Sequence, residues 1–164
     1  MPPAPRSRPS SKKSPVADPG ELGEALVAHW LTKHGWTVLH QRWRCRWGEL
    51  DIIAGLQTED QTEWTTLAFV EVKTRSRGNW DGDGSLAITA QKQAKLWKAA
   101  ELFLMAHPTL VTATCRFDVA LVQCERLSGS VDVSGVDGET VAIAAGHRLT
   151  LLDYIPSAFT QEAL

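Results

Sequence analysis

Charged side chains interrupt two strand-like apolar segments of the sequence. Segment 67–73 reads LAFVEVK, and period-two alternation in a strand places Glu71 and Lys73 on the same face. Segment 48–53 reads GELDII, in which Asp51 directly precedes aliphatic residues. A charge at the end of an apolar strand is costly unless it pairs or binds an ion. Asp51, Glu71 and Lys73 therefore mark a candidate site.

A hairpin between these two strands would bring the carboxylates of Asp51 and Glu71 together. Two such carboxylates suit Mg²⁺, a hard cation that prefers oxygen ligands and keeps several waters. The cation would acidify a bound water and polarise a phosphoryl oxygen. Lys73 could orient or deprotonate that water, or stabilise charge on the phosphate. A structural ion pair between Lys73 and one acid accounts for the same residues equally well, so both interpretations stay open.

Other charged residues have weaker signals. Glu24 lies at the margin of the apolar arc of the first expected helix, which favours a position facing the sheet, although an edge glutamate in water is the plainer interpretation. Glu49 shares a face with Asp51 but lies nearer the strand entrance, so we expect it to be solvated or to support the ligands. Arg116 and Asp118 share a face of one strand, and we expect them to form a structural pair.

Three groups of basic residues could hold a phosphodiester backbone. Arginines alternate with tryptophans at Trp43 and Trp47, and in an extended chain the two types occupy opposite faces. Arginines suit phosphates and tryptophans stack on bases, although core anchoring explains the tryptophans as well. A stripe of lysines on the second expected helix is more often a solvated face. The predicted nucleic-acid-binding residues are Arg42, Arg44, Arg46, Arg75, Arg77, Lys92, Lys95 and Lys98.

The elements that position these residues alternate between helix and strand. Thr89 is a good N-cap for the second helix, which Pro108 ends, and Gly35 is a natural stop for the first. The predicted helices are 20–35 and 89–107. The predicted strands are 36–39, 48–54, 65–75 and 114–124. Two further strands, 131–133 and 140–144, should form a hairpin around an Asp137-Gly138 turn. This order predicts an α/β fold with helices around a mixed sheet.

Length and composition indicate a single domain with one appendage. The chain has 164 residues, and residues 1–19 hold four basic residues against one acid and six of the eight prolines. We expect this segment to be a disordered tail, followed by one domain over 20–164. Three widely spaced cysteines without a CxxC pair indicate reduced thiols in a cytoplasm. No apolar run is long enough to span a bilayer, so we expect no membrane association.

Four motifs together resemble a known family. GELGEALVAHWLTKHGW, RWGELDIIA, FVEVKTR and RFDVALV occur in this order and resemble the YraN-like family of uncharacterised bacterial proteins. That family is similar to archaeal Holliday-junction resolvases and belongs to the restriction-endonuclease-like, PD-(D/E)xK superfamily. The likeness is strongest over 20–124. Asp51 with Glu71-x-Lys73 matches the superfamily motif, and Glu24 matches the first-helix glutamate of the resolvase-like branch.

The resemblance implies a restriction-endonuclease-like fold and a set of site residues. The implied catalytic residues are Glu24, Asp51, Glu71 and Lys73, of which the three acids would hold Mg²⁺, with Mn²⁺ as a substitute. It also implies DNA as the partner, branched or otherwise non-standard structures among its forms, and it permits a homodimer.

Two hypotheses from different classes follow. The first is a metal-dependent nuclease that hydrolyses phosphodiester bonds in DNA, which the intact set of acids and lysine favours. The second is a nucleic-acid-binding or interaction module without turnover. The nearly balanced charges of residues 20–124 and the acidic residues after 124 favour this second hypothesis.

Overall fold

The computed structural model describes residues 16–78, 88–128, 135–136 and 139–160. The predicted tail falls mostly outside this range, and so does the predicted strand 131–133. The described elements are α1 (Pro19–Lys33), β1 (Thr37–Cys45), β2 (Gly48–Gln57), β3 (Trp64–Ser76), α2 (Ala90–Ala106), the 3-10 helix η1 (Pro108–Leu110), β4 (Thr114–Arg126), β5 (Gly135–Val136), β6 (Val141–Ala144) and β7 (His147–Phe159).

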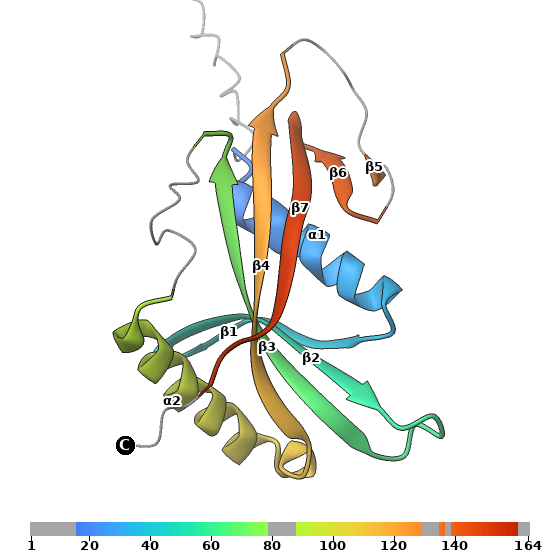
Figure 1. Ribbon diagram of the computed structural model, residues 1–164, viewed down its shortest axis with the longest axis vertical. Coiled ribbons are helices and arrows are strands. Elements are labelled where there is room, and N and C mark those ends of the chain that lie inside the picture. Colours follow the sequence, from blue (N-terminus) through green and yellow to red (C-terminus); the bar gives the residue numbers. More distant parts are fainter. Residues whose placement is uncertain (1–15, 79–87, 129–134, 137–138, 161–164) are drawn as a thin grey trace, which may run out of the picture.

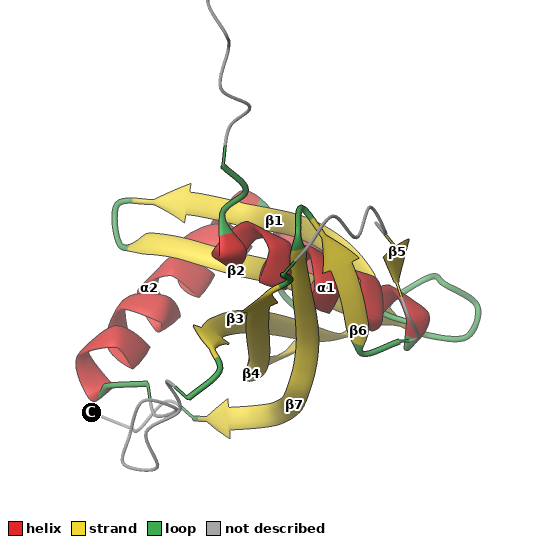
Figure 2. Ribbon diagram, turned by 90° about the horizontal axis from the view of Figure 1, so that it is seen from above, coloured by secondary structure: helices red, strands yellow, loops and turns green. Residues whose placement is uncertain are grey.

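The described strands form one mixed sheet between two helices. Its order is β1-β2-β3-β4-β7-β6-β5, and the β3–β4 pair is parallel while the other neighbours are antiparallel. Helix α2 makes the crossover from β3 to β4, as a parallel pair requires. The sheet is strongly curved, with β1 and β2 running across the direction of β7 (Figure 2). The predicted α/β fold is confirmed, and the arrangement is consistent with the restriction-endonuclease-like fold.

Strand alternation divides the core into two layers. Helix α1 and helix α2 cover opposite faces of the sheet (Figure 1). Neighbouring residues of the central strands point to opposite sides, so Ala68 packs on the α1 side whereas Leu67 and Phe69 pack on the α2 side. The near-continuous apolar sequences of β3 and β4 result from this burial on both faces.

The helix ends agree with the sequence to within one or two residues. The Asp18 side chain accepts a hydrogen bond from the backbone N–H of Gly20 and caps α1. The Thr89 hydroxyl accepts one from the N–H of Lys92 and caps α2. Gly35 has φ +83°, a left-handed conformation that glycine adopts at no steric cost after a helix.

Two strands differ from the prediction. Strand β1 continues to Cys45 rather than ending at Leu39, because β2 pairs with it to that point. Strand β7 is thirteen residues long, although no strand was predicted there from the sequence. Its pairing with β4 is irregular between Val119 and Phe117, and the irregularity accommodates Pro156. Long-range pairing, which local patterns do not contain, sets the extent of both strands.

A glycine allows α1 to approach the sheet closely. A Cβ atom at Gly23 would lie 2.1 Å from the Thr74 hydroxyl oxygen of β3, far inside van der Waals contact. Gly23 is buried on the helix face that carries Glu24. The close approach of helix to strand therefore brings the Glu24 carboxylate to the edge of the sheet.

Gly23→Ala is expected to lower the free energy of unfolding by about 1–3 kcal/mol, because helix and strand must separate to admit the methyl group. Gly20→Ala is the matched control, because a Cβ there meets only Asp18 atoms at 3.4 Å or more. That control should be neutral or stabilising by up to about 1 kcal/mol. Urea denaturation of both variants measures the difference, and equal stabilities would contradict the packing argument.

Candidate functional site

The site lies where β2 and β3 separate. Their ladder ends at the pair Ile52–Val70. Beyond it, the Asp51 carboxylate takes the place of a backbone partner, since its Oδ2 accepts a hydrogen bond from the N–H of Val72 at 2.8 Å. The predicted convergence of the two strands is confirmed, and the splayed strand ends hold Asp51 partly buried.

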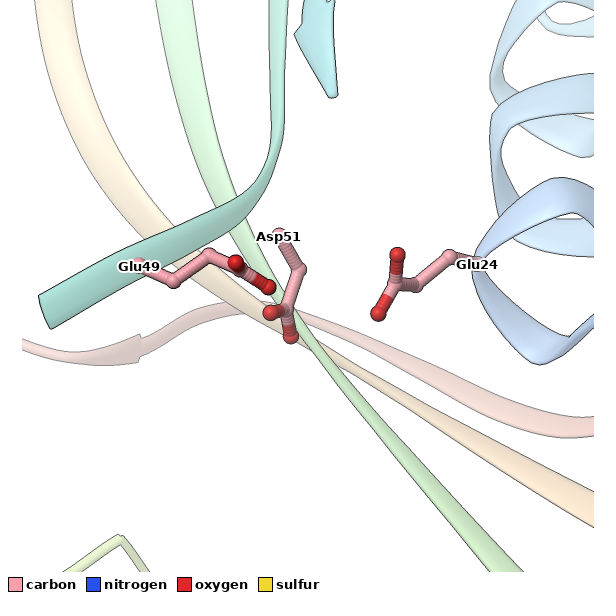
Figure 3. Close-up of side chains that lie close together, drawn as sticks. All are labelled: Glu24, Glu49 and Asp51. Carbon is pink, nitrogen blue, oxygen red and sulfur yellow. The ribbon is translucent and has the colours of Figure 1, made fainter. Parts of the chain in front are cut away.

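Three carboxylates converge at this point. One oxygen from each of Glu24, Glu49 and Asp51 lies within 4.8 Å of the others. Glu24 extends from α1 toward Asp51, while Glu49 and Asp51 come from β2 (Figure 3). Glu24 is only 8% exposed. We call these three residues the acidic cluster.

Glu71 lies beside the acidic cluster on β3. It is buried, and its charge is close enough to raise the pKa of Asp51. Its Oε1 pairs with the ammonium of Lys92 from α2. Lys73, two residues further along the same face, is also buried. Of the predicted set, Asp51 interacts with Glu71 and Glu71 with Lys73. Among the described residues, however, the converging group holds Glu24 and Asp51 but not Glu71, and the roles of all four stay predictions.

Cationic side chains from β1 contact the acidic cluster. Arg42 donates from Nε to Glu24 Oε2 at 2.7 Å and also bonds Glu21 of α1 at 2.6 Å. Arg42 has φ +52°, an uncommon backbone conformation for a residue with a side chain. Arg44 donates from Nε to Glu49 Oε2 at 2.5 Å. Two arginines that the sequence assigned to nucleic acid therefore neutralise carboxylates of the site in this conformation.

The remaining predicted basic residues are more scattered. Arg46 and Lys98 lie over the Trp47 ring, at 5.5 and 4.2 Å from its centroid. Arg77 is exposed and contacts Glu125 at 3.4 Å. Arg75 and Lys95 are also exposed. Arg75 donates a hydrogen bond to the backbone carbonyl of Thr74, and Lys95 lines a cavity at the start of α2.

Burial and charge repulsion perturb two ionisable groups. Desolvation, together with the nearby charge of Glu71, raises the pKa of Asp51 to about 7, against the smaller opposing effect of the Val72 N–H. Desolvation, with repulsion from Lys92 and Arg75, lowers the pKa of Lys73. Asp51 is therefore mostly protonated below about pH 7, and Lys73 loses its proton more readily than an ordinary lysine.

The donor set fits a hard divalent cation. Carboxylate oxygens from two elements converge, and Asp51 is a partly buried acid whose raised pKa shows that ionisation is less favourable there than in water. Glu49 is the residue that the sequence underrated. The signal was present, because Glu49 shares the face of Asp51, but only the packing of α1 beside β2 placed its carboxylate near Glu24.

The fold and this site define a class: a single-domain α/β protein with a restriction-endonuclease-like sheet and an acidic cluster at the point where two strands separate. The sequence family agrees. Residues 23–122 match the model of the uncharacterised protein family UPF0102, so the chain belongs to that family, the YraN-like group named above. The matched region includes the acidic cluster together with Glu71 and Lys73.

Cyanobacterial members of the family are similar over nearly the whole chain. A UPF0102 protein of Trichodesmium erythraeum is 51% identical over 160 residues, covering 87% of this chain and 88% of the relative. One from Acaryochloris marina is 49% identical over 171 residues, covering 97% and 98%. One from a Nostoc strain is 45% identical, covering 84% and 91%.

In the described part of this chain, neither helix has the length and apolar character needed to cross a membrane.

Proposed function

We propose that this protein is a metal-dependent nuclease that hydrolyses phosphodiester bonds in DNA. The observation that carries the proposal is the acidic cluster, with a partly buried Asp51 whose pKa is raised to about 7. Arginines neutralise Glu24 and Glu49, but Asp51 stays beside the repelling charge of Glu71. Repelling carboxylates that are held together favour a cation. The reaction class also agrees with the likeness to the PD-(D/E)xK superfamily.

The proposed ligands are Glu24, Asp51 and Glu71, with Glu49 as a fourth candidate on the strength of its position. A bound Mg²⁺ or Mn²⁺ would supply an acidified water and would polarise the phosphoryl oxygen. The hydrogen bond from Val72 orients the Asp51 carboxylate. Lys73 shares the face of Glu71, and its lowered pKa suits it to accept a proton from the attacking water or to orient that water.

Arg42, Arg44 and Lys92 have two roles in this proposal. Without metal they neutralise Glu24, Glu49 and Glu71. When a divalent cation takes over these carboxylates, the guanidinium and ammonium groups become available to phosphates, for which arginine is well suited. Metal and nucleic acid should therefore each strengthen the binding of the other.

The alternative is a nucleic-acid-binding or interaction module without turnover. The same contacts favour it, because Glu24, Glu49 and Glu71 already have cationic partners within the chain. In that case the ion pairs are structural, and a divalent cation would have no advantage over the side chains already present.

Thermal unfolding with and without Mn²⁺, together with a cleavage assay, separates the two functions. The nuclease predicts that Mn²⁺ raises the melting temperature and supports cleavage of linear, single-stranded or branched DNA. Lys73→Ala should retain the Mn²⁺ shift and lose cleavage, because lysine is not a magnesium ligand.

The matched control is Glu59→Gln, which neutralises an exposed acid in the β2–β3 turn. It should behave as the wild type in both measurements. If Mn²⁺ does not change the wild-type melting temperature and none of these DNAs is cleaved, the nuclease proposal is refuted. The binding or interaction module without turnover is then the function supported.

A further inference from the structure

A cavity of about 320 Å³ opens beside the acidic cluster. The β1–β2 turn forms one wall with Trp47 and Glu49, and the first turns of α2 form the other with Thr89, Gln91, Lys92 and Lys95. Two of these residues also belong to the site, since Glu49 is in the acidic cluster and Lys92 pairs with Glu71. Whatever occupies the cavity therefore lies next to the reacting centre.

The turn wall of the cavity offers an aromatic side chain in a fixed position. Trp47 is half-buried and packs on the apolar layer beneath α2. Lys98 and Arg46 both lie over its ring, so the indole already has cations against it that a base would replace. Leu96, which is 5% exposed, adds an apolar surface to the cavity lining. A held indole beside an aliphatic residue suits a flat, uncharged ring, and every nucleobase has such a face.

The helix wall of the cavity is positive. Lys92 and Lys95 are exposed lysines that line it, and because Lys92 pairs with Glu71 in the metal-free protein, Lys95 is the lysine that would contact an anion. The Thr89 hydroxyl caps the N–H of Lys92, and the other N–H groups of the first turn have no partner within the helix. These groups and the helix dipole favour an anion at this end. The acid in the turn wall, Glu49, is neutralised by Arg44.

We propose that this cavity binds one unpaired nucleotide of the DNA, with its base stacked on the Trp47 ring in place of a cation that lies over it, and with its phosphate against Lys95 and the start of α2. The inference rests on the proposed function for the presence of DNA at the site. The cavity volume is near the lower end of the roughly 300–1,000 Å³ of small-ligand sites, which suits a single nucleotide. A base stacked within a duplex is inaccessible to such a pocket. The substrates are then DNAs with a single-stranded segment next to the bond that is cut.

Binding without cleavage tests this subsite directly. We would measure fluorescence anisotropy in EDTA with a labelled blunt duplex and with the same duplex carrying a short thymidine overhang. The wild type should bind the overhang DNA about 5- to 150-fold more tightly, the range expected for stacking of one base. Trp47→Leu, which keeps apolar bulk but removes the aromatic face, should abolish that preference, and Trp47→Phe should keep it.

A lysine variant tests the phosphate end. Lys95→Ala should reduce the slope of log affinity against log salt for the overhang DNA by about 0.7, the value for one single-strand phosphate contact. The matched control is Lys33→Ala, an exposed lysine in the last turn of α1, which should leave the slope unchanged. In the wild type, 2-aminopurine in the overhang should lose fluorescence on binding, so the test does not depend on the folding of Trp47→Leu.

Equal binding of blunt and overhang DNA by the wild type, or an overhang preference that survives Trp47→Leu, would overturn the subsite. An unquenched 2-aminopurine would do the same. If the protein cleaves blunt and overhang DNA alike, the nuclease stands and the subsite is wrong. If the overhang preference depends on Trp47 but no DNA is cut, the subsite stands in a binding module.

Discussion

Asp51→Asn is expected to reduce metal-dependent cleavage by at least about a hundredfold, since even partners outside a metal's ligand set contribute 10- to 100-fold. The same change should stabilise the metal-free protein above pH 7. Asparagine keeps an oxygen to accept the Val72 N–H but carries no charge to desolvate next to Glu71. Loss of cleavage in a protein that is more stable than wild type would separate a functional acid from a structural one.

The stabilising effect of Asp51→Asn should depend on pH. The pKa of Asp51 is about 7 in the folded chain and takes its ordinary value of 3.8 when unfolded, so the folded state holds a proton that the unfolded state has lost. The wild-type free energy of unfolding should fall as pH rises from about 4 to about 7 and then level off. Asp51→Asn has no carboxyl group to ionise, so its free energy of unfolding should not fall in this way. It should exceed the wild-type value by about 1–4 kcal/mol at pH 8 and nearly equal it at pH 4.

Urea denaturation at pH 5 and pH 8, repeated with Mn²⁺ at pH 8, measures both parts of this expectation. Mn²⁺ should stabilise the wild type and have no effect on Asp51→Asn. Glu59→Gln again serves as the control with an exposed acid. An Asp51→Asn protein that is less stable than wild type at pH 8 would mean that the carboxylate is held by favourable contacts, and the metal-site interpretation would then fail.

The second large effect concerns Asp118, whose side chain is fully buried between β4 and β7. Its carboxylate accepts hydrogen bonds from Arg116 Nε at 3.1 Å, from the Tyr154 hydroxyl at 2.6 Å and from the N–H of Ser157 at 2.9 Å. Ser157 has φ +49°, and it lies where the β4–β7 ladder is irregular. The predicted structural pair of Arg116 and Asp118 is confirmed, and it also anchors the last strand.

Asp118→Ala is expected to lower the free energy of unfolding by about 3–5 kcal/mol, because it leaves a cation and two donors without their buried acceptor. Asp118→Asn should cost less, since it keeps one acceptor. Arg77→Ala removes an exposed ion pair and should cost at most about 1 kcal/mol. Similar losses for Asp118→Ala and Arg77→Ala in urea denaturation would show that the buried network contributes little.

Much of the fold was predictable from local patterns. Thr89 and Pro108 delimit α2, and the apolar run before Glu71 identifies β3. Capping and side-chain alternation act between residues that are near in sequence, so they are visible in it. The pairing of β2 with β3 was also accessible, because neighbouring strands in a chain commonly form a hairpin, and it placed Asp51 beside Glu71.

The sequence by itself determined the types of residue at the site, the order of helices and strands, and the kind of chemistry those residues favour. The tertiary structure alone decided which charges meet. In the tertiary structure the carboxylates of Glu49 and Glu24 lie close together, and Glu71 pairs with Lys92 of α2. Arg42, which has a positive φ, bonds Glu24. The tertiary structure also buried Asp51 enough to raise its pKa to about 7. These outcomes depend on the approach of helices and strands that are distant in sequence, and the energy of a charge depends on burial and neighbours rather than on residue type.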